Sequence, residues 1–147
     1  MSEDIVPGWN PLGDVPARSD AQIFELLTAA VFQARFRPDV VRARWPSIRA
    51  AFAGFDLATV ATWPDERVAE LLQAPGMIRS PKKITATLRN ARDLLGLSRR
   101  SGGARAWIES QGPGEEERVR AIDAWAHYVG APSLRWFVRN LDGQAGA

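Results

Sequence analysis

The chain of 147 residues is 46% hydrophobic and 24% charged, which excludes an intrinsically disordered protein and fits one domain with a buried core. It has no cysteine, one histidine and no apolar run near the roughly 18 residues of a spanning helix, which excludes disulfides, cysteine or multi-histidine metal sites and a membrane protein. Residues 35–100 carry a net charge of +7 within a chain of net +2, which indicates either a polyanion partner or helices with solvated arginines.

Residues 1–18 are predicted to form an irregular N-terminal arm, because proline and glycine interrupt them. A first helix over about 20–36 follows, since Ser19 and Gln22 match a capping box. Apolar residues then recur at helical spacing and predict one buried stripe. The stripe consists of Ile23, Phe24, Leu27, Ala30, Val31 and Ala34.

Proline and aspartate mark the next helix starts. Pro38 suits the first turn of a second helix, and Pro46 inside it predicts a kink or a break. Asp56 is the expected N-cap of a short helix, and Pro64 the first turn of another.

The stretch "QAPGMIRSPKKI" leads into the longest predicted helix. Ser80 is a good N-cap and Pro81 a good first residue. Gly96 is expected to end this helix, because glycine favours the position after a helix C-terminus. The following "SRRSGG" is then predicted to be a basic loop.

Three more helices are predicted in the last third of the chain. A short one covers "ARAWIES", and another starts at the three glutamates 115–117 and runs to about Tyr128. A tight turn, "YVGAPS", leads to a last helix over "LRWFVRNL". No stretch has the alternation of a strand.

The predicted fold is therefore all-α: a compact bundle of about seven or eight short helices with a helix-hairpin-helix near the C-terminus. Residues 19–142 are expected to form a single helical domain, and residues 143–147 a tail.

Two helix starts have the features of anion sites. Arg79, Lys82 and Lys83 crowd the N-terminal end of the helix that Ser80 caps, where cations are unfavourable unless an anion binds. The alternative is that the lysines extend into water, at a cost of a few tenths of a kcal/mol.

The second such start is the turn at Val129 and Gly130, which exposes unpaired N–H groups at the beginning of the last helix. Ser133 is the last residue of this turn, and Arg135 lies in the first turn of the helix. A helix-turn-helix corner without a binding role is the alternative. Together the two starts predict a protein that binds a phosphate backbone.

Several motifs resemble the 3-methyladenine DNA glycosylase I branch of the helix-hairpin-helix DNA glycosylases. The shared elements are Phe24-Glu25, Gln33-Ala34, Phe52 to Asp56, Gly76 to Arg79, Lys83 to Arg92, and Val129-Gly130 of the hairpin. The resemblance covers about residues 15–142. It implies an all-α protein of base excision repair that grips double-stranded DNA, damaged or not, and extrudes one nucleotide.

The departures from this family fall on the base pocket. Its motif E-G-x-Q-A-G-L-S-W corresponds here to "AVFQARFRP", so Ala30 replaces the base-recognising Glu and Pro38 the stacking Trp. Arg35 and Arg37 replace the Gly and Ser. The family's zinc site of two Cys and two His is excluded, because cysteine is absent. The chain is expected to need no cofactor or metal.

The resemblance assigns candidate residues but no catalytic group, which stays unknown. The base-pocket candidates are Ala30, Gln33, Arg35 and Arg37. The DNA-backbone candidates are Arg79, Ser80, Lys82, Lys83, Val129, Gly130, Ser133 and Arg135. Gln33 would either read a base edge or tie down a helix end.

Other polar and aromatic residues have structural interpretations. Glu25 is expected to form a local ion pair, His127 to pack in the hairpin, and Trp9 to cover a pocket or surface groove. The core tryptophans are predicted to be Trp45, Trp107, Trp125 and Trp136.

Two functions follow from these patterns. One is a DNA glycosylase of altered specificity that releases a base by hydrolysis of the N-glycosidic bond. The other is a catalytically inactive DNA-binding or interaction module of the same fold. A helical protein–protein adaptor, a third reading, predicts no salt-dependent DNA affinity. The expected protein is a monomer in the cytoplasm, associated with the nucleoid, with no membrane partner.

Overall fold

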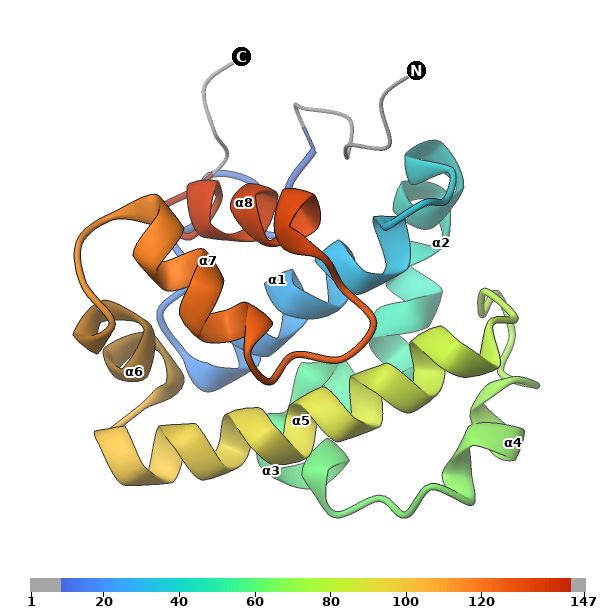
Figure 1. Ribbon diagram of the computed structural model, residues 1–147. Helices are drawn as coiled ribbons and strands as arrows, with labels where there is room; N and C mark the ends of the chain where they lie inside the picture. The colour runs from blue at the N-terminus through green and yellow to red at the C-terminus, as the bar shows by residue number, and fades with distance from the viewer. Residues whose placement is uncertain (1–8, 144–147) are drawn as a thin grey trace.

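A computed structural model describes residues 9–143, and within them the chain is helical, with no strand. The all-α prediction is confirmed (Figure 1). The elements are α1 (Asp20–Gln33), α2 (Pro38–Ala51), the 3-10 helix η1 (Ala53–Phe55), α3 (Leu57–Ala61), α4 (Arg67–Leu71), α5 (Pro81–Ser101), α6 (Ala104–Ser110), α7 (Glu115–Asp123) and α8 (Ala131–Arg139). None of these helices has both the length and the apolar character needed to traverse a bilayer.

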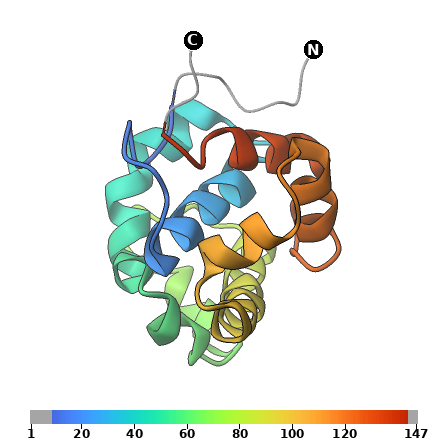
Figure 2. The ribbon, with the colours of Figure 1, turned by 90° about the vertical axis from the view of Figure 1, so that its left-hand side faces the viewer.

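Helix α1 is the centre of the bundle. It packs against α2, α3, α5, α6 and α8, and Figure 2 shows the other helices around it. Every residue from Ile23 to Gln33 is buried, so α1 is enclosed on all sides and not only along the predicted stripe. The predicted capping box of Ser19 and Gln22 is present at its start.

An aromatic cluster fills the space between α1, α2 and η1. Trp45 stacks on Phe55 with ring centroids 5.4 Å apart, and Trp9 meets Trp45 edge-on at 5.7 Å. Trp9 therefore packs on the core and lines neither of the two surface grooves described below. Edge-to-face packing also joins the half-buried Trp107 and Trp125, at 6.0 Å.

Two expected helix breaks are absent. Pro46 is exposed and does not split α2, because Trp45 and Ile48 on either side of it stay buried on one face. Gly96 does not end α5, which continues to Ser101 and is closed by Gly102 in the left-handed conformation, at φ 79°. A glycine inside a helix costs only about 1 kcal/mol, which tertiary contacts of the last turns offset.

One such contact involves Ser98, whose hydroxyl donates to Asp20 Oδ2 at 2.5 Å. The same carboxylate accepts the N–H of Ala104 at 2.9 Å, so it ties α1 to the end of α5 and the start of α6. The predicted basic loop is therefore mostly helix, with Arg99 and Arg100 in the last turn, where the helix dipole favours cations.

Other predicted boundaries are displaced as well. The last helix, α8, starts at Ala131 inside the predicted turn and ends at Arg139. Helix α1 ends at Gln33 because Arg35 adopts a left-handed φ of 52°. Helix α4 starts at Arg67, after a turn that begins at Pro64. Helix α7 ends at Asp123, before Tyr128, and residues 124–130 form the connection to α8.

The described part of the N-terminal arm is irregular, as predicted, but it is packed against the domain. Asn10 is buried and its amide donates to the backbone and side-chain oxygens of Asn140, both at 3.2 Å. The N–H of Ala17 donates to Leu141 O at 2.7 Å. The arm therefore closes the C-terminal end of α8.

Gly76 fixes the loop before α5 against α2. It has a left-handed φ of 75°, and a Cβ there would lie 2.5 Å from Ser47 Oγ and 2.6 Å from Ser47 Cβ. We expect Gly76→Ala to lower the free energy of unfolding by about 2–4 kcal/mol, through backbone strain and the clash together. Gly54→Ala is the matched control, because Gly54 has φ 64° and no atom within 4 Å of a built Cβ. Equal losses in urea unfolding of the two variants would contradict a role for the contact with Ser47.

Candidate nucleic-acid groove

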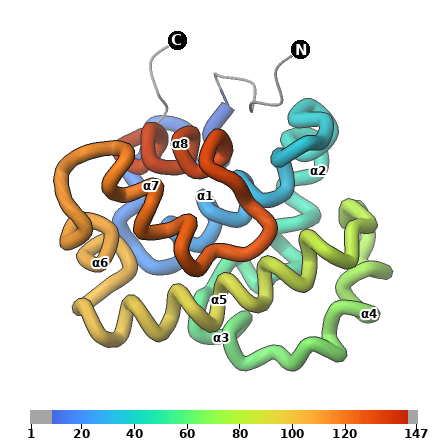
Figure 3. Tube along the Cα trace, viewed as in Figure 1, coloured from blue at the N-terminus to red at the C-terminus, as the bar shows by residue number. Residues whose placement is uncertain are grey.

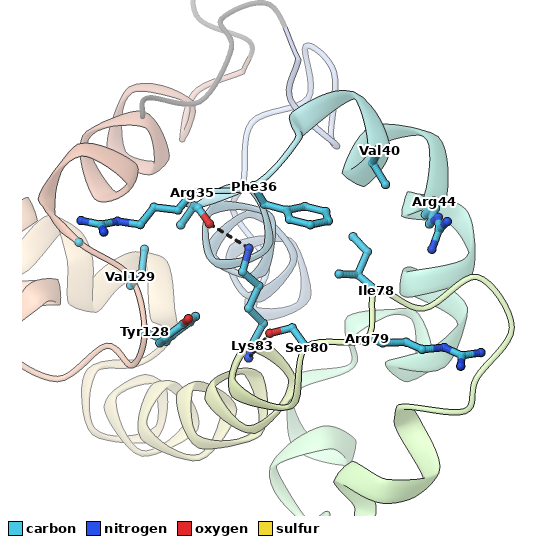
Figure 4. Close-up of a pocket in the computed structure, with 12 residues that line it drawn as sticks. Arg35, Phe36, Val40, Arg44, Ile78, Arg79, Ser80, Lys83, Tyr128 and Val129 are labelled. Atoms are coloured by element: carbon cyan, nitrogen blue, oxygen red, sulfur yellow. Dashed lines mark hydrogen bonds between the residues drawn. The ribbon is translucent and has the colours of Figure 1, made fainter. Parts of the chain in front are cut away.

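A groove, called the main groove below, lies where three connections meet: the one between α1 and α2, the loop before α5, and residues 124–130. Its volume is about 740 Å³, within the range of ligand-binding sites. The chain between α7 and α8, which Figure 3 draws as a tube, is held to α5 by the hydrogen bonds of Asn90 with His127. The lining residues, drawn in Figure 4, are Ala34, Arg35, Phe36, Val40, Arg44, Ile78, Arg79, Ser80, Lys83, Tyr128, Val129 and Gly130.

The groove is strongly basic. Four of the lining residues, Arg35, Arg44, Arg79 and Lys83, are cationic, and none is a carboxylate. Arg44 and Arg79 are exposed and make no hydrogen bond or ion pair within residues 9–143. A concave surface of one charge sign concentrates ions of the opposite sign, so this groove suits an anionic ligand.

Lys83 belongs to the groove but is turned inward. Its side chain is buried, and Nζ donates to Phe32 O at 2.6 Å and to Ala34 O at 2.9 Å. These carbonyls lie at the C-terminal end of α1, where backbone acceptors lack helical partners. Nζ also lies 4.8 Å from the centroid of the Phe36 ring. Lys83 therefore ties the end of α1 to α5.

Burial lowers the pKa of Lys83 from 10.5 to about 8. The predicted role of Lys83 as a phosphate contact needs an ammonium group directed at solvent, whereas two carbonyl oxygens already hold this one.

The cations at the start of α5 lie in two different grooves. Ser80 caps the helix as predicted, accepting the N–H of Lys83 at 3.2 Å. Arg79, just before the cap, lines the main groove, whereas Lys82 lines a second, smaller groove on the other side of Tyr128.

Two helices, α7 and α8, lie at the predicted place of the hairpin. Gly130 is the N-cap of α8, and Val129 and Gly130 line the main groove. Ser133 is buried and does not line it. Arg135 also stays outside the lining and pairs with Glu116 of α7, with Nε 2.8 Å from Oε2.

Of the four predicted base-pocket residues, only Arg35 lines the groove. Ala30 and Gln33 are in the core, at 0% and 1% exposure. Gln33 Nε2 donates to Ala29 O at 3.2 Å, while Gln33 Oε1 has no partner within residues 9–143. Arg37 is exposed outside the lining and pairs with Asp39 at 3.1 Å.

Sequence reasoning missed one cation of the groove, Arg44. It lies one helical turn from Val40 on α2, and both face the lining (Figure 4). The four-residue spacing of Val40 and Arg44 predicts that both side chains lie on one face of α2. It does not predict which other segment packs beside that face. The apolar lining residues Phe36 and Ile78 were missed for the same reason.

No carboxylate of the described chain lines the main groove at the place of the missing pocket Glu. Glu25 is buried behind the aromatic cluster, where Trp45 Nε1 donates to it at 2.9 Å and Arg49 lies at 3.9 Å. Burial raises the pKa of this carboxyl above 4.5. The ion pair is therefore not the local one expected, because its partner Arg49 lies on α2, and it is weaker than the hydrogen bond from Trp45. Asp142 is held by Arg105 at 2.6 Å, outside the groove.

His127 packs in the connection to α8, as predicted: Asn90 binds its backbone and Asp93 its ring, at 2.9 Å from Nε2. Residues 9–143 contain no group of three or more His, Asp or Glu side chains arranged to hold a metal ion.

Comparison with solved structures identifies the same fold in 3-methyladenine DNA glycosylase I. One crystal structure has a TM-score of 0.75 at 22% identity, covering 96% of this chain and 93% of that one. The enzyme from Staphylococcus aureus, solved to describe its recognition of 3-methyladenine, has a TM-score of 0.75 at 14% identity, covering 88% and 80%. A solution structure has 0.72 at 24% identity, covering 90% and 81%.

The sequence itself matches the methyladenine glycosylase family over residues 13–129, which is most of the chain. This match includes α1, the connection that carries Arg35, and the loop before α5. The chain therefore belongs to the methyladenine glycosylase family.

Proposed function

We propose that this protein is a DNA glycosylase of base excision repair that binds double-stranded DNA and receives one extruded nucleotide in the main groove. The observation that carries the proposal is the groove itself, with four cations and no carboxylate in its lining. Family membership supports the reaction class, hydrolysis of the bond between a base and its sugar. The substrate would be chromosomal DNA, bound by a monomer in the cytoplasm.

The charge of the groove favours a particular class of base. When the C1′–N bond breaks, its electron pair goes to the base nitrogen, so a neutral base leaves as an anion. Cations that line the groove lower the free energy of a negative charge that develops there. A cationic base such as 3-methyladenine leaves as a neutral molecule and is repelled beforehand by Arg35, Arg44 and Arg79. We therefore propose neutral or acidic damaged bases as substrates.

The rim of the groove supplies the proposed contacts to the DNA backbone. Arg79 and Ser80 border it on one side, and Val129 and Gly130 on the other. The first turn of α8 leaves N–H groups without helical partners, which are suitable donors to a phosphate. Such contacts position the duplex without reading its sequence.

One observation favours the second candidate function, binding without hydrolysis. A water that attacks C1′ must lose a proton, and a carboxylate is the usual acceptor in such sites. The groove lining contains none, and Glu25 lies outside it. A module that extrudes and holds a damaged nucleotide, without cleaving it, fits the same groove.

Base release distinguishes the two functions. Duplexes with a single uracil, hypoxanthine, 8-oxoguanine or 3-methyladenine are incubated with excess protein, and the free base is measured by mass spectrometry. Affinity for each duplex is measured in parallel over a range of salt concentrations. Release of a neutral base, but not of 3-methyladenine, is the expected result. Preferred release of 3-methyladenine would overturn the proposed base class, and binding without release of any base would establish the module.

Arg35 and Arg37 form a matched pair for the groove itself. We expect Arg35→Ala to weaken binding to a lesion-bearing duplex about tenfold, because it removes a cation from the lining. Arg37→Ala changes the net charge equally but lies outside the lining, beside Asp39, so binding should change less than about twofold. Equal effects of the two substitutions on fluorescence anisotropy would contradict binding in this groove.

A further inference from the structure

Tyr128 is presented to solvent in an unusual way. The residue is 53% exposed, the highest value among the large hydrophobic residues of 9–143. Its backbone has a left-handed φ of 57°, which costs a non-glycine residue about 1–2 kcal/mol. An exposed aromatic ring on a strained backbone persists only where the surrounding structure holds it.

Asn90 of α5 holds the residue just before Tyr128. Asn90 is 1% exposed, and its Oδ1 accepts the N–H of His127 at 2.7 Å while its Nδ2 donates to His127 O at 3.3 Å. Asp93, one turn further along α5, binds the His127 ring at 2.9 Å. The tyrosine is therefore positioned in advance, so that a ligand stacking on it would meet a small entropic cost.

Tyr128 separates the main groove from a second one. This second groove has a volume of about 360 Å³ and runs along the first turns of α5. Its polar lining consists of the cations Lys82 and Arg89 with Thr85 and His127, and contains no carboxylate. Arg89 has Asp65 at 3.6 Å, whereas Lys82 is exposed and has no ion-pair or hydrogen-bond partner within residues 9–143.

We propose that the second groove is a subsite for the nucleotide next to the extruded one, with its phosphate on Lys82 and Arg89 and its base stacked on Tyr128. An aromatic ring between basic surfaces is how proteins hold consecutive nucleotides of an unpaired strand. Because Tyr128 lines both grooves, a strand that enters the main groove passes this ring. The inference rests on the proposed function, since it extends the same DNA strand beyond the main groove.

Binding to a short duplex with one tetrahydrofuran abasic-site analogue tests the subsite. Stacking on an aromatic residue corresponds to about a 5- to 150-fold change in affinity, so we expect Tyr128→Ala to weaken binding at least about fivefold. Tyr128→Phe keeps the ring and should stay within about twofold. Lys82→Ala should lower the slope of log affinity against log salt by about one. Arg99→Ala, an exposed cation in the last turn of α5, is the control and should leave affinity nearly unchanged.

A fluorescent base reports the stacking directly. Two duplexes are compared, one with 2-aminopurine 5′ and one with 2-aminopurine 3′ of the abasic site. The wild type and Tyr128→Phe should quench the 2-aminopurine fluorescence in one of these duplexes, and Tyr128→Ala in neither. Thermal unfolding midpoints verify that each variant is folded.

Unchanged affinity and quenching in Tyr128→Ala, in a protein whose wild type binds DNA with a clear salt dependence, would overturn the subsite and leave the proposed function intact. Absence of salt-dependent binding by the wild type would instead overturn the proposed function, and the subsite with it.

Discussion

Replacing Arg44 and Arg79 together by glutamate should lower the affinity for duplex DNA by at least about 100-fold at moderate salt. Both arginines line the main groove, are exposed, and lack ion-pair partners within the described chain. Each substitution removes one phosphate neighbour and adds a repulsive charge, which corresponds to about tenfold or more per site. The slope of log affinity against log salt should fall by about two.

The control for this double reversal is Arg99→Glu with Arg100→Glu. Both arginines lie in the last turn of α5, whereas the first turn of this helix borders the main groove (Figure 1). The control therefore changes the net charge of the protein by the same amount, but at the end of α5 that is far from the groove. Fluorescence anisotropy over a salt series measures both proteins. An equal loss in the control would show that only net charge matters, and no loss in the groove variant would exclude this groove as the DNA interface.

Lys83→Met should lower the free energy of unfolding by about 2–4 kcal/mol. Methionine keeps most of the buried aliphatic chain but leaves Phe32 O and Ala34 O without their donor, and an unsatisfied buried carbonyl costs about 1–3 kcal/mol. Urea unfolding measures the loss. Ala34 directly precedes Arg35, so losing its hydrogen bond should also shift Arg35 in the main groove. DNA binding should therefore weaken more than the stability loss alone would give.

The difference between wild type and Lys83→Met should also depend on pH. The folded-state pKa of Lys83 is about 8 and the ordinary value is 10.5, so between these values the unfolded chain binds more protons than the folded one. The stability contributed by Lys83 therefore rises with pH in this window, by up to about 1.4 kcal/mol per unit, and is level below pH 8. Other titrating groups are shared by both proteins and cancel in the difference. Parallel stability curves from pH 7 to 10 would contradict the lowered pKa.

The helix starts that a side chain caps could be predicted from the sequence, because their determinants are local. Ser19 accepts a hydrogen bond from the N–H of Gln22, three residues along the chain, and Ser80 does the same with Lys83. Asp56 caps α3 in the same way, through Thr59. Such caps need no distant partner, and the spacing of apolar residues between them was enough to establish an all-α fold.

Helix ends were harder to predict, since distant contacts decide several of them. Ser98 is held by Asp20, which extends α5 past Gly96. Asn90 binds the backbone of His127, which fixes the connection after α7. Neither partner is within one helical turn of the residue it holds, so no local pattern records the interaction.

The sequence by itself determined the family, the helical fold and the set of cations near the two helix starts. Only the tertiary structure decided which cations face a groove. It turned Lys83 onto the end of α1, paired Arg135 with Glu116, and brought Arg44 into the lining. The physical reason is that burial and ion pairing depend on segments that meet only when the helices pack, whereas periodicity describes one helix at a time.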